Sequence, residues 1–308
     1  MNAPTIHPWK TRLRWVFVGA NGLRAIWGVL IFVAISVAIA FALRLAMHGK
    51  LAFPPGEITP RMELLLEGTQ AALVLLATAI MAWAEGKSVF AYGLRDRRAA
   101  VHYLCGVLGG TAMLSLLVAV LHAGGYLATD GLALHGPVTI LSYGLAWLAG
   151  FSLTGVAEEA LYRGYLQTTL GRAIGFWPAA VTLSAIFAAG HIQNDSETIA
   201  GVAQVFVAGL VFCLFLRASG SLWLGIGVHA SWNWAQAFLW GTPESGLLMQ
   251  GHLFAMHAVG DPRLSGGSVG PEGSWLASPI MVLGAFGLIA LTRAAKLLDG
   301  HRAPAEAT

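Results

Sequence analysis

The sequence contains few charged residues for its length. Asp, Glu, Lys and Arg make up 11% of the 308 residues, whereas about 25% is usual in soluble globular domains. This shortage excludes an ordinary soluble domain. The 18 basic residues are scattered among short loops and form no basic stripe, and the net charge is only +3. We therefore expect no nucleic-acid partner.

Cysteine and several familiar motifs are also scarce. The two cysteines, Cys105 and Cys213, lie inside apolar segments, which excludes a secreted disulfide framework and a metal-type Cys spacing. We interpret both as small packing residues. No pair of His at helical spacing encloses a Glu, so the common zinc-protease helix is absent. No internal repeat of the kind that marks many transporters is visible.

Long apolar runs dominate what is present. A helix needs about 20 apolar residues to cross a bilayer. Eight segments approach this length: residues 25–46, 64–84, 101–122, 138–160, 177–192, 198–217, 221–240 and 275–295. The first is too long for a secretory signal, so we interpret it as an uncleaved anchor. The sequence therefore predicts an all-α fold, a polytopic membrane helix bundle with about eight transmembrane helices.

The basic residues indicate how this bundle is oriented. If the N-terminus is cytoplasmic, 14 of the 18 basic residues lie inside and 4 lie outside. This bias follows the positive-inside rule and predicts that both termini are cytoplasmic. We expect a multi-pass protein in the lipid of a bacterial inner (cell) membrane. The expected parts are a basic N-terminal segment (1–24), N-terminal transmembrane helices (25–137), a membrane core (138–240), a flexible loop (241–274), and the last helix with its tail (275–308).

Ionisable side chains inside the apolar runs are the main functional signal, because they are costly in lipid. They form three pairs whose members are four residues apart, and hence on one helix face: Glu159 with Arg163, Phe187 with His191, and His229 with Asn233. Glu158 precedes the first pair. Neighbouring helical residues diverge by about 100°, so Glu158 and Glu159 cannot have the same role. The arginine four residues on makes Glu159 the expected structural acid.

Helix geometry places these groups at one depth. Glu158 lies 14 residues before Arg172, and His191 lies 14 residues after Trp177. Two antiparallel helices joined by the turn between them would hold Glu158 and His191 about 21 Å from that turn. Asn233 would lie about 18 Å deep in its own helix. We therefore expect the three polar groups to meet, in a chamber that opens toward the cytoplasm or the lipid.

One segment is too long for this scheme. A helix over residues 138–172 would extend about 52 Å, but a bilayer core is only about 30 Å thick. Either Gly150 and Gly155 break the helix, or residues 163–172 lie along the cytoplasmic interface.

The motifs EEALYR, FAAGH and HASWN resemble, in order and spacing, those of the CPBP family, the CAAX proteases and bacteriocin-processing enzymes. Within it, the chain resembles the membrane-embedded type II CAAX prenyl endopeptidases and their bacterial relatives. The resemblance covers residues 138–240 and implies a catalytic core of four helices that hydrolyses a peptide bond of a membrane-associated protein or peptide.

The resemblance also implies a role for each matching residue. Glu158 would be the general base that takes a proton from water, and His191 would hold that water. His229 and Asn233 would stabilise the oxyanion. Glu159, held by Arg163, would support the site, and Phe187 would shape the pocket beside His191.

Metal use and substrate stay open at this point. The family is commonly described as metalloproteases, but also as enzymes with a glutamate-activated water and no metal. Zinc accepts N and O ligands, and the candidate ligands are Glu158, His191 and His229. Nothing in the sequence selects a prenylated CAAX substrate over another peptide. Two other classes remain, a catalytically silent scaffold or bacteriocin-immunity protein and a proton-coupled transporter that uses the buried Glu and His as a relay.

Overall fold

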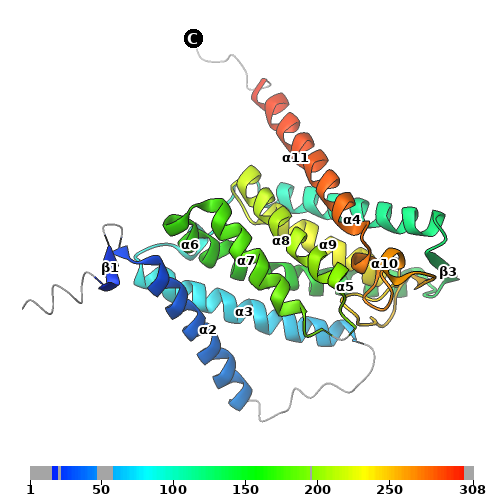
Figure 1. Cartoon of the computed structure of the whole chain (residues 1–308), viewed down its shortest axis with the longest axis horizontal. Coiled ribbons are helices and arrows are strands. Elements are labelled where there is room, and N and C mark those ends of the chain that lie inside the picture. Colours follow the sequence, from blue (N-terminus) through cyan, green and yellow to red (C-terminus); the bar gives the residue numbers. More distant parts are fainter. Residues whose placement is uncertain (1–15, 20–21, 47–57, 195, 302–308) are drawn as a thin grey trace, which may run out of the picture.

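The computed structural model describes residues 16–19, 22–46, 58–194 and 196–301, which form a bundle of helices (Figure 1). A helix occupies each of the eight segments expected from the sequence. These are α2 (Ala25–Ala46), α3 (Pro60–Ala84), α4 (Ala99–Ala123), α5 (Pro137–Glu159), α7 (Phe176–His191), α8 (Ile199–Ser219), α9 (Trp223–Trp234) and α11 (Ala277–His301). The predicted all-α polytopic membrane bundle is confirmed.

The number of spanning helices differs from the expected eight. Six helices among the described residues are long and apolar enough to cross a membrane. They are α2, α3, α4, α8, α11 and the helical run Pro137–Ile174. The other two, α7 with 16 residues and α9 with 12, are shorter, so the count of eight is not confirmed.

Helix α9 can be short because it is buried in the middle of the bundle. Glycines let α4 approach its backbone directly. A Cβ on Gly106 would lie 2.4 Å from the carbonyl oxygen of Leu224, and a Cβ on Gly227 would lie 2.2 Å from that of Tyr103. Small residues allow such close packing between membrane helices. The packing fixes α9, which carries His229 and Asn233, against the rest of the bundle.

The long segment after Pro137 is broken, but not at either expected glycine. Gly150 and Gly155 lie inside an uninterrupted α5, where Gly150 packs against the Glu63 side chain and Gly155 against Ile226. The chain instead continues into a π-helix, η2 (Ala160–Leu166), whose backbone leaves helical geometry at Gly164 (φ −80°, ψ −105°). Helix α6 (Gln167–Ile174) follows. Of the two alternatives, a break at Gly150 and Gly155 is therefore wrong, and the placement of residues 163–172 along the cytoplasmic interface stays a prediction.

A second π-helix, η3 (Ala235–Leu239), follows α9 directly. Thus η2 begins one residue after Glu159, and η3 begins two residues after Asn233. Single-turn π segments are rare in proteins, and those that do occur are often found at functional sites.

The two ends of the bundle are distinguished by their connections. At one, which we name the loop end, strand β3 (Leu127–Leu132) pairs with β4 (Phe254–Ala258), and Ile58 bridges to Met249. The 241–274 loop lies here and also contains α10 (Pro262–Ser265) and η4 (Pro271–Gly273). At the opposite end, the backbone N–H of Leu222 donates a hydrogen bond to the carbonyl of Gly93. This end also contains the short elements β1 (Val18–Gly19), β2 (Gly22–Leu23) and η1 (Val89–Ala91). The flexibility expected of the 241–274 loop stays a prediction.

Candidate active site

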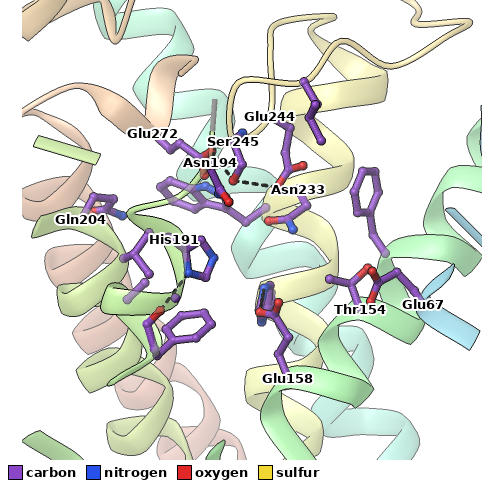
Figure 2. A pocket seen from close by; sticks show the side chains of 18 of the residues that line it. Glu67, Thr154, Glu158, His191, Asn194, Gln204, Asn233, Glu244, Ser245 and Glu272 are labelled. Atoms are coloured by element: carbon purple, nitrogen blue, oxygen red, sulfur yellow. Dashed lines mark hydrogen bonds and ion pairs between the residues drawn. The ribbon is translucent and has the colours of Figure 1, made fainter. Parts of the chain in front are cut away.

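A cavity of about 430 Å³ lies between α3, α5, α7, α8, α9 and the 241–274 loop (Figure 2). Glu158, Phe187, His191, His229 and Asn233 all line it. The convergence expected from their depths is therefore confirmed. Glu159 and Arg163 do not line the cavity but lie behind it.

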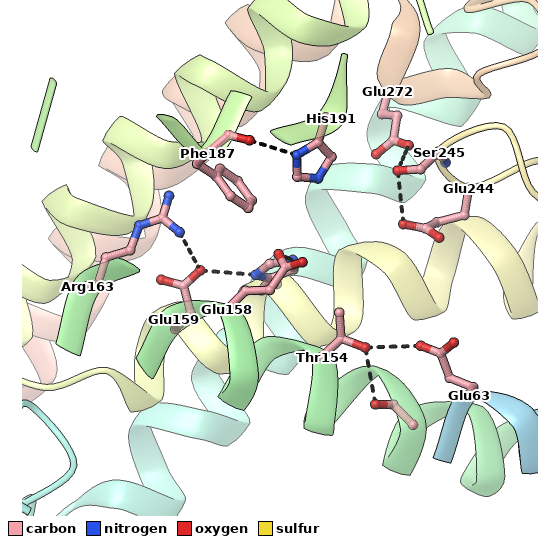
Figure 3. Close-up of polar contacts among 12 residues, drawn as sticks. Glu63, Thr154, Glu158, Glu159, Arg163, Phe187, His191, Glu244, Ser245 and Glu272 are labelled. Atoms are coloured by element: carbon pink, nitrogen blue, oxygen red, sulfur yellow. Dashed lines mark hydrogen bonds and ion pairs between the residues drawn. The ribbon is translucent and has the colours of Figure 1, made fainter. Parts of the chain in front are cut away.

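The two adjacent glutamates face different surroundings. The Glu158 side chain is 19% exposed and faces the cavity, whereas that of Glu159 is 1% exposed. The Glu159 Oε1 atom is 3.2 Å from a guanidinium nitrogen of Arg163 and 3.0 Å from Nδ1 of His229 (Figure 3). Because both partners contact the same oxygen, Glu159 holds an arginine and a histidine together.

Arg163 and the aromatic rings around it form a buried layer that closes one side of the cavity, which we name the Arg163 layer. The Arg163 side chain is only 1% exposed. The guanidinium carbon lies 4.6 Å from the ring centre of Phe187, 5.2 Å from that of Phe212 and 5.7 Å from that of Tyr162. Aromatic faces within about 6 Å attract a cation. The buried charge of Arg163 is therefore balanced by one carboxylate and several rings.

His191 has one ring nitrogen fixed and one available. Its Nδ1 lies 2.9 Å from the backbone carbonyl oxygen of Phe187, which can only accept a hydrogen bond. Nδ1 therefore carries the proton, and in the neutral ring Nε2 has a free lone pair. The Phe187 ring meets the imidazole edge to face at 4.7 Å. His191 thus presents a basic nitrogen at the cavity, with Phe187 restricting its position.

His229 lies between the two carboxylates. Its Nδ1 contacts Glu159 at 3.0 Å and its Nε2 contacts Glu158 at 3.5 Å. Phe212 stacks on the ring at 4.9 Å between centres, with an 11° angle between planes. Asn233, one turn further along α9, faces the same cavity (Figure 2). The site therefore offers a carboxylate, two imidazoles and an amide around one space.

The candidate zinc ligands do not form a metal site. Across the described ranges, no group of three or more His, Cys, Asp and Glu side chains is arranged to hold a metal ion. Of Glu158, His191 and His229, only Glu158 and His229 are in direct contact. The donor set therefore does not fit a zinc ion, and we derive no catalytic step through a metal.

Two cavity carboxylates, Glu63 and Glu67, were not identified from the sequence. The second span was expected to begin at residue 64, which left Glu63 outside it, and Glu67 inside it was not singled out. Helix α3 begins at Pro60 instead, since Thr59 caps it by accepting a hydrogen bond from the Met62 N–H at 3.3 Å. This start brings Glu63 into the same helix as Glu67, four residues apart and on the cavity wall. Thr154 donates a hydrogen bond to Glu63 at 3.0 Å. The i,i+4 spacing in an apolar helix was the signal that could have found them.

The 241–274 loop contributes a further pair of carboxylates that no sequence pattern indicated. The backbone N–H and the hydroxyl of Ser245 both donate to Oε1 of Glu272, at 2.7 and 3.2 Å, and the hydroxyl lies 3.4 Å from Oε1 of Glu244 (Figure 3). Ser245 adopts φ 49°, a left-handed conformation that is uncommon for a residue other than glycine. Burial, together with the charge of Glu272, raises the pKa of Glu244 well above its ordinary value. Burial also raises the pKa of Glu272.

Comparison with known proteins agrees with the motifs. Residues 140–235 match the family model described as type II CAAX prenyl endopeptidase Rce1-like. No curated protein matches the chain. The matched range contains all three motifs and both histidines, and it ends before the 241–274 loop. The six apolar helices together with the match indicate an integral membrane protein. By family model as well as by motif, residues 140–235 of this chain are similar to the Rce1-like type II CAAX prenyl endopeptidases.

Proposed function

We propose that the protein is an intramembrane endopeptidase in which Glu158 activates a water molecule. The observation that carries this proposal is the convergence of Glu158, His191 and His229 on one cavity within an Rce1-like segment. Glu159 and Arg163, buried behind the cavity, hold the catalytic histidine His229 in place.

Hydrolysis in this site would proceed by addition and elimination. The water is held between Glu158 and Nε2 of His191, and its oxygen attacks the substrate carbonyl while Glu158 takes one proton. The new C–O bond produces a tetrahedral oxyanion. Glu158 then gives the proton to the amide nitrogen, the C–N bond breaks, and the two products are a carboxylic acid and an amine.

His229 and Asn233 would stabilise the oxyanion. His229 donates a hydrogen bond to Glu159 through Nδ1. To donate a second hydrogen bond to the oxyanion through Nε2, the imidazole must carry a proton on both nitrogens. The Asn233 amide supplies a second N–H group from one turn further along α9. Removing one donor of this kind typically lowers kcat by about 10²–10³-fold.

The substrates are membrane-associated proteins or peptides, because the cavity lies within a bundle of membrane helices. The family match makes prenylated CAAX-type peptides the first class to test. We place the protein in a bacterial inner membrane, as expected from the sequence, and the charge distribution supports the placement of both termini in the cytoplasm.

The test is a cleavage assay on purified protein in lipid nanodiscs. Quenched fluorogenic peptides, some S-farnesylated near the C-terminus and some carried on a membrane helix, are compared between wild type and Glu158→Gln. Asp130→Asn, which changes an exposed carboxylate on β3, serves as the matched control. Cleavage by wild type and Asp130→Asn, but not by Glu158→Gln, is expected. Equal turnover by Glu158→Gln would contradict the proposal.

The same variants separate the two alternatives. A scaffold or immunity protein would retain its function in the Glu158→Gln form. A proton-coupled transporter would show uptake into proteoliposomes that the substitution abolishes, without peptide cleavage.

A further inference from the structure

The cavity leads toward the loop end of the bundle. Its deep wall is formed by Glu158, Phe187 and His229. The remaining walls are residues near the loop end: Glu63 and Glu67 in the first two turns of α3, Asn194 after α7, and Ile58, Glu244, Ser245, Leu247, Met249 and Glu272 from the loops. The cavity therefore faces the 241–274 loop, in which Leu247 is 42% exposed.

The opposite side of the cavity is closed. Arg163 and Glu159, each 1% exposed, lie directly behind His229. Phe187 and Phe212 pack over the arginine and fill the space between α7 and α8. A peptide approaching from that end would have to displace a buried ion pair and its aromatic cover, which is costly.

The two ends also differ in basic charge. Eight Lys and Arg residues whose side chains are described belong to the opposite end: Arg24, Lys87, Arg95, Arg97, Arg98, Arg172, Arg217 and Arg293. Three belong to the loop end: Arg44, Arg61 and Arg263. Because basic residues accumulate on the cytoplasmic side, the opposite end is cytoplasmic and the loop end is not.

We propose that substrates reach Glu158 through the loop end, from the non-cytoplasmic side of the membrane. This inference rests on the proposed protease function for its substrate, a peptide segment exposed on that surface. The proposed side of access differs from the one expected from the sequence, which predicted a chamber that opens toward the cytoplasm or the lipid.

Thiol labelling tests the side of access without any need for activity. Single cysteines replace Asn194 in the cavity, Leu247 at its mouth (42% exposed) and Arg97 at the opposite end, in a background with Cys105→Ala and Cys213→Ala. If thermal unfolding shows that the background is destabilised, the fully buried Cys213 is retained. Intact cells and sealed inside-out vesicles are treated with a charged, membrane-impermeant methanethiosulfonate, and modification is measured by mass spectrometry.

The expected result is labelling of Asn194→Cys and Leu247→Cys in intact cells, and of Arg97→Cys only in inside-out vesicles. The reverse pattern would overturn the proposal. Labelling of Leu247→Cys without Asn194→Cys would also overturn it, because the loop end would then not lead into the cavity. Since labelling requires no turnover, a failure of the protease assay would not affect this result.

Discussion

Oε1 of Glu159 lies 3.0 Å from Nδ1 of His229, although 70 residues separate them in the chain. The same oxygen contacts Arg163 at 3.2 Å, while Nε2 of His229 is 3.5 Å from Glu158. Two neighbouring carboxylates on α5 thus contact opposite nitrogens of one imidazole. Glu159 is placed to fix the ring, and Glu158 is left to face the cavity.

Replacing either proposed water-binding residue should stop cleavage without unfolding the protein. Glu158→Ala and His191→Ala each remove a group that faces the cavity, and loss of a positioned general base typically costs about 10²–10⁴-fold in rate. Peptide turnover and detergent thermal unfolding are measured side by side, with Asp130→Asn as the control. Near-normal cleavage by either folded variant would refute its assignment.

Arg163→Ala should destabilise the protein more than Glu158→Ala does. Arg163 is 1% exposed and bonded to Glu159, so its removal leaves a buried carboxylate without its cationic partner. Breaking a buried pair in this way costs about 3–5 kcal/mol. Thermal unfolding in detergent measures the difference, and equal Tm values for Arg163→Ala and wild type would show that the pair does not stabilise the fold.

Glu159→Gln should lower kcat more than it raises KM. The substitution keeps the size of the side chain but replaces the charged acceptor that orients His229, and so weakens oxyanion stabilisation. Since Glu159 acts through His229, we expect a loss smaller than the roughly 10²–10³-fold cost of deleting an oxyanion donor itself. Steady-state kinetics of Glu159→Gln and His229→Ala, together with the double variant, test this. Additive losses would show that the two residues act separately.

The 241–274 loop should open more readily as pH rises. The pKa of Glu244 is raised by burial and by Glu272, from an ordinary value of 4.5. The closed loop therefore holds this proton more tightly than an open loop does. Protonated Glu244 therefore stabilises the closed loop. This stabilisation is complete at pH values below the ordinary pKa of a glutamate and is lost as the pH rises through the raised pKa of Glu244.

Hydrogen exchange at amides 244–249, corrected for intrinsic rates, measures this opening across neutral pH. Glu244→Gln should reduce the pH dependence, because glutamine does not titrate. Asp130→Asn, at the same end of the molecule, should leave it unchanged. A corrected exchange rate that is independent of pH in wild type would contradict the prediction.

Several features could be predicted from the sequence because they depend on local geometry. The low charge and the apolar runs predict a membrane bundle, and a fixed rise per residue places Glu158, His191 and Asn233 at one depth. The divergence of neighbouring helical residues separates Glu158 from Glu159, and the structure places Glu158 at the cavity and Glu159 behind it. Helical periodicity acts within one helix and requires no knowledge of its neighbours.

Other features were decided only by the tertiary structure. The break at Gly164, rather than at Gly150 or Gly155, depends on close packing of those two glycines against Glu63 and Ile226. Glu244 and Glu272 reach the cavity because the 241–274 loop folds back over it, which no periodicity encodes. The direction of the cavity likewise follows from which end the Arg163 layer closes. These outcomes depend on contacts between segments far apart in the chain, and a sequence pattern carries no information about which distant surface will fill a given space.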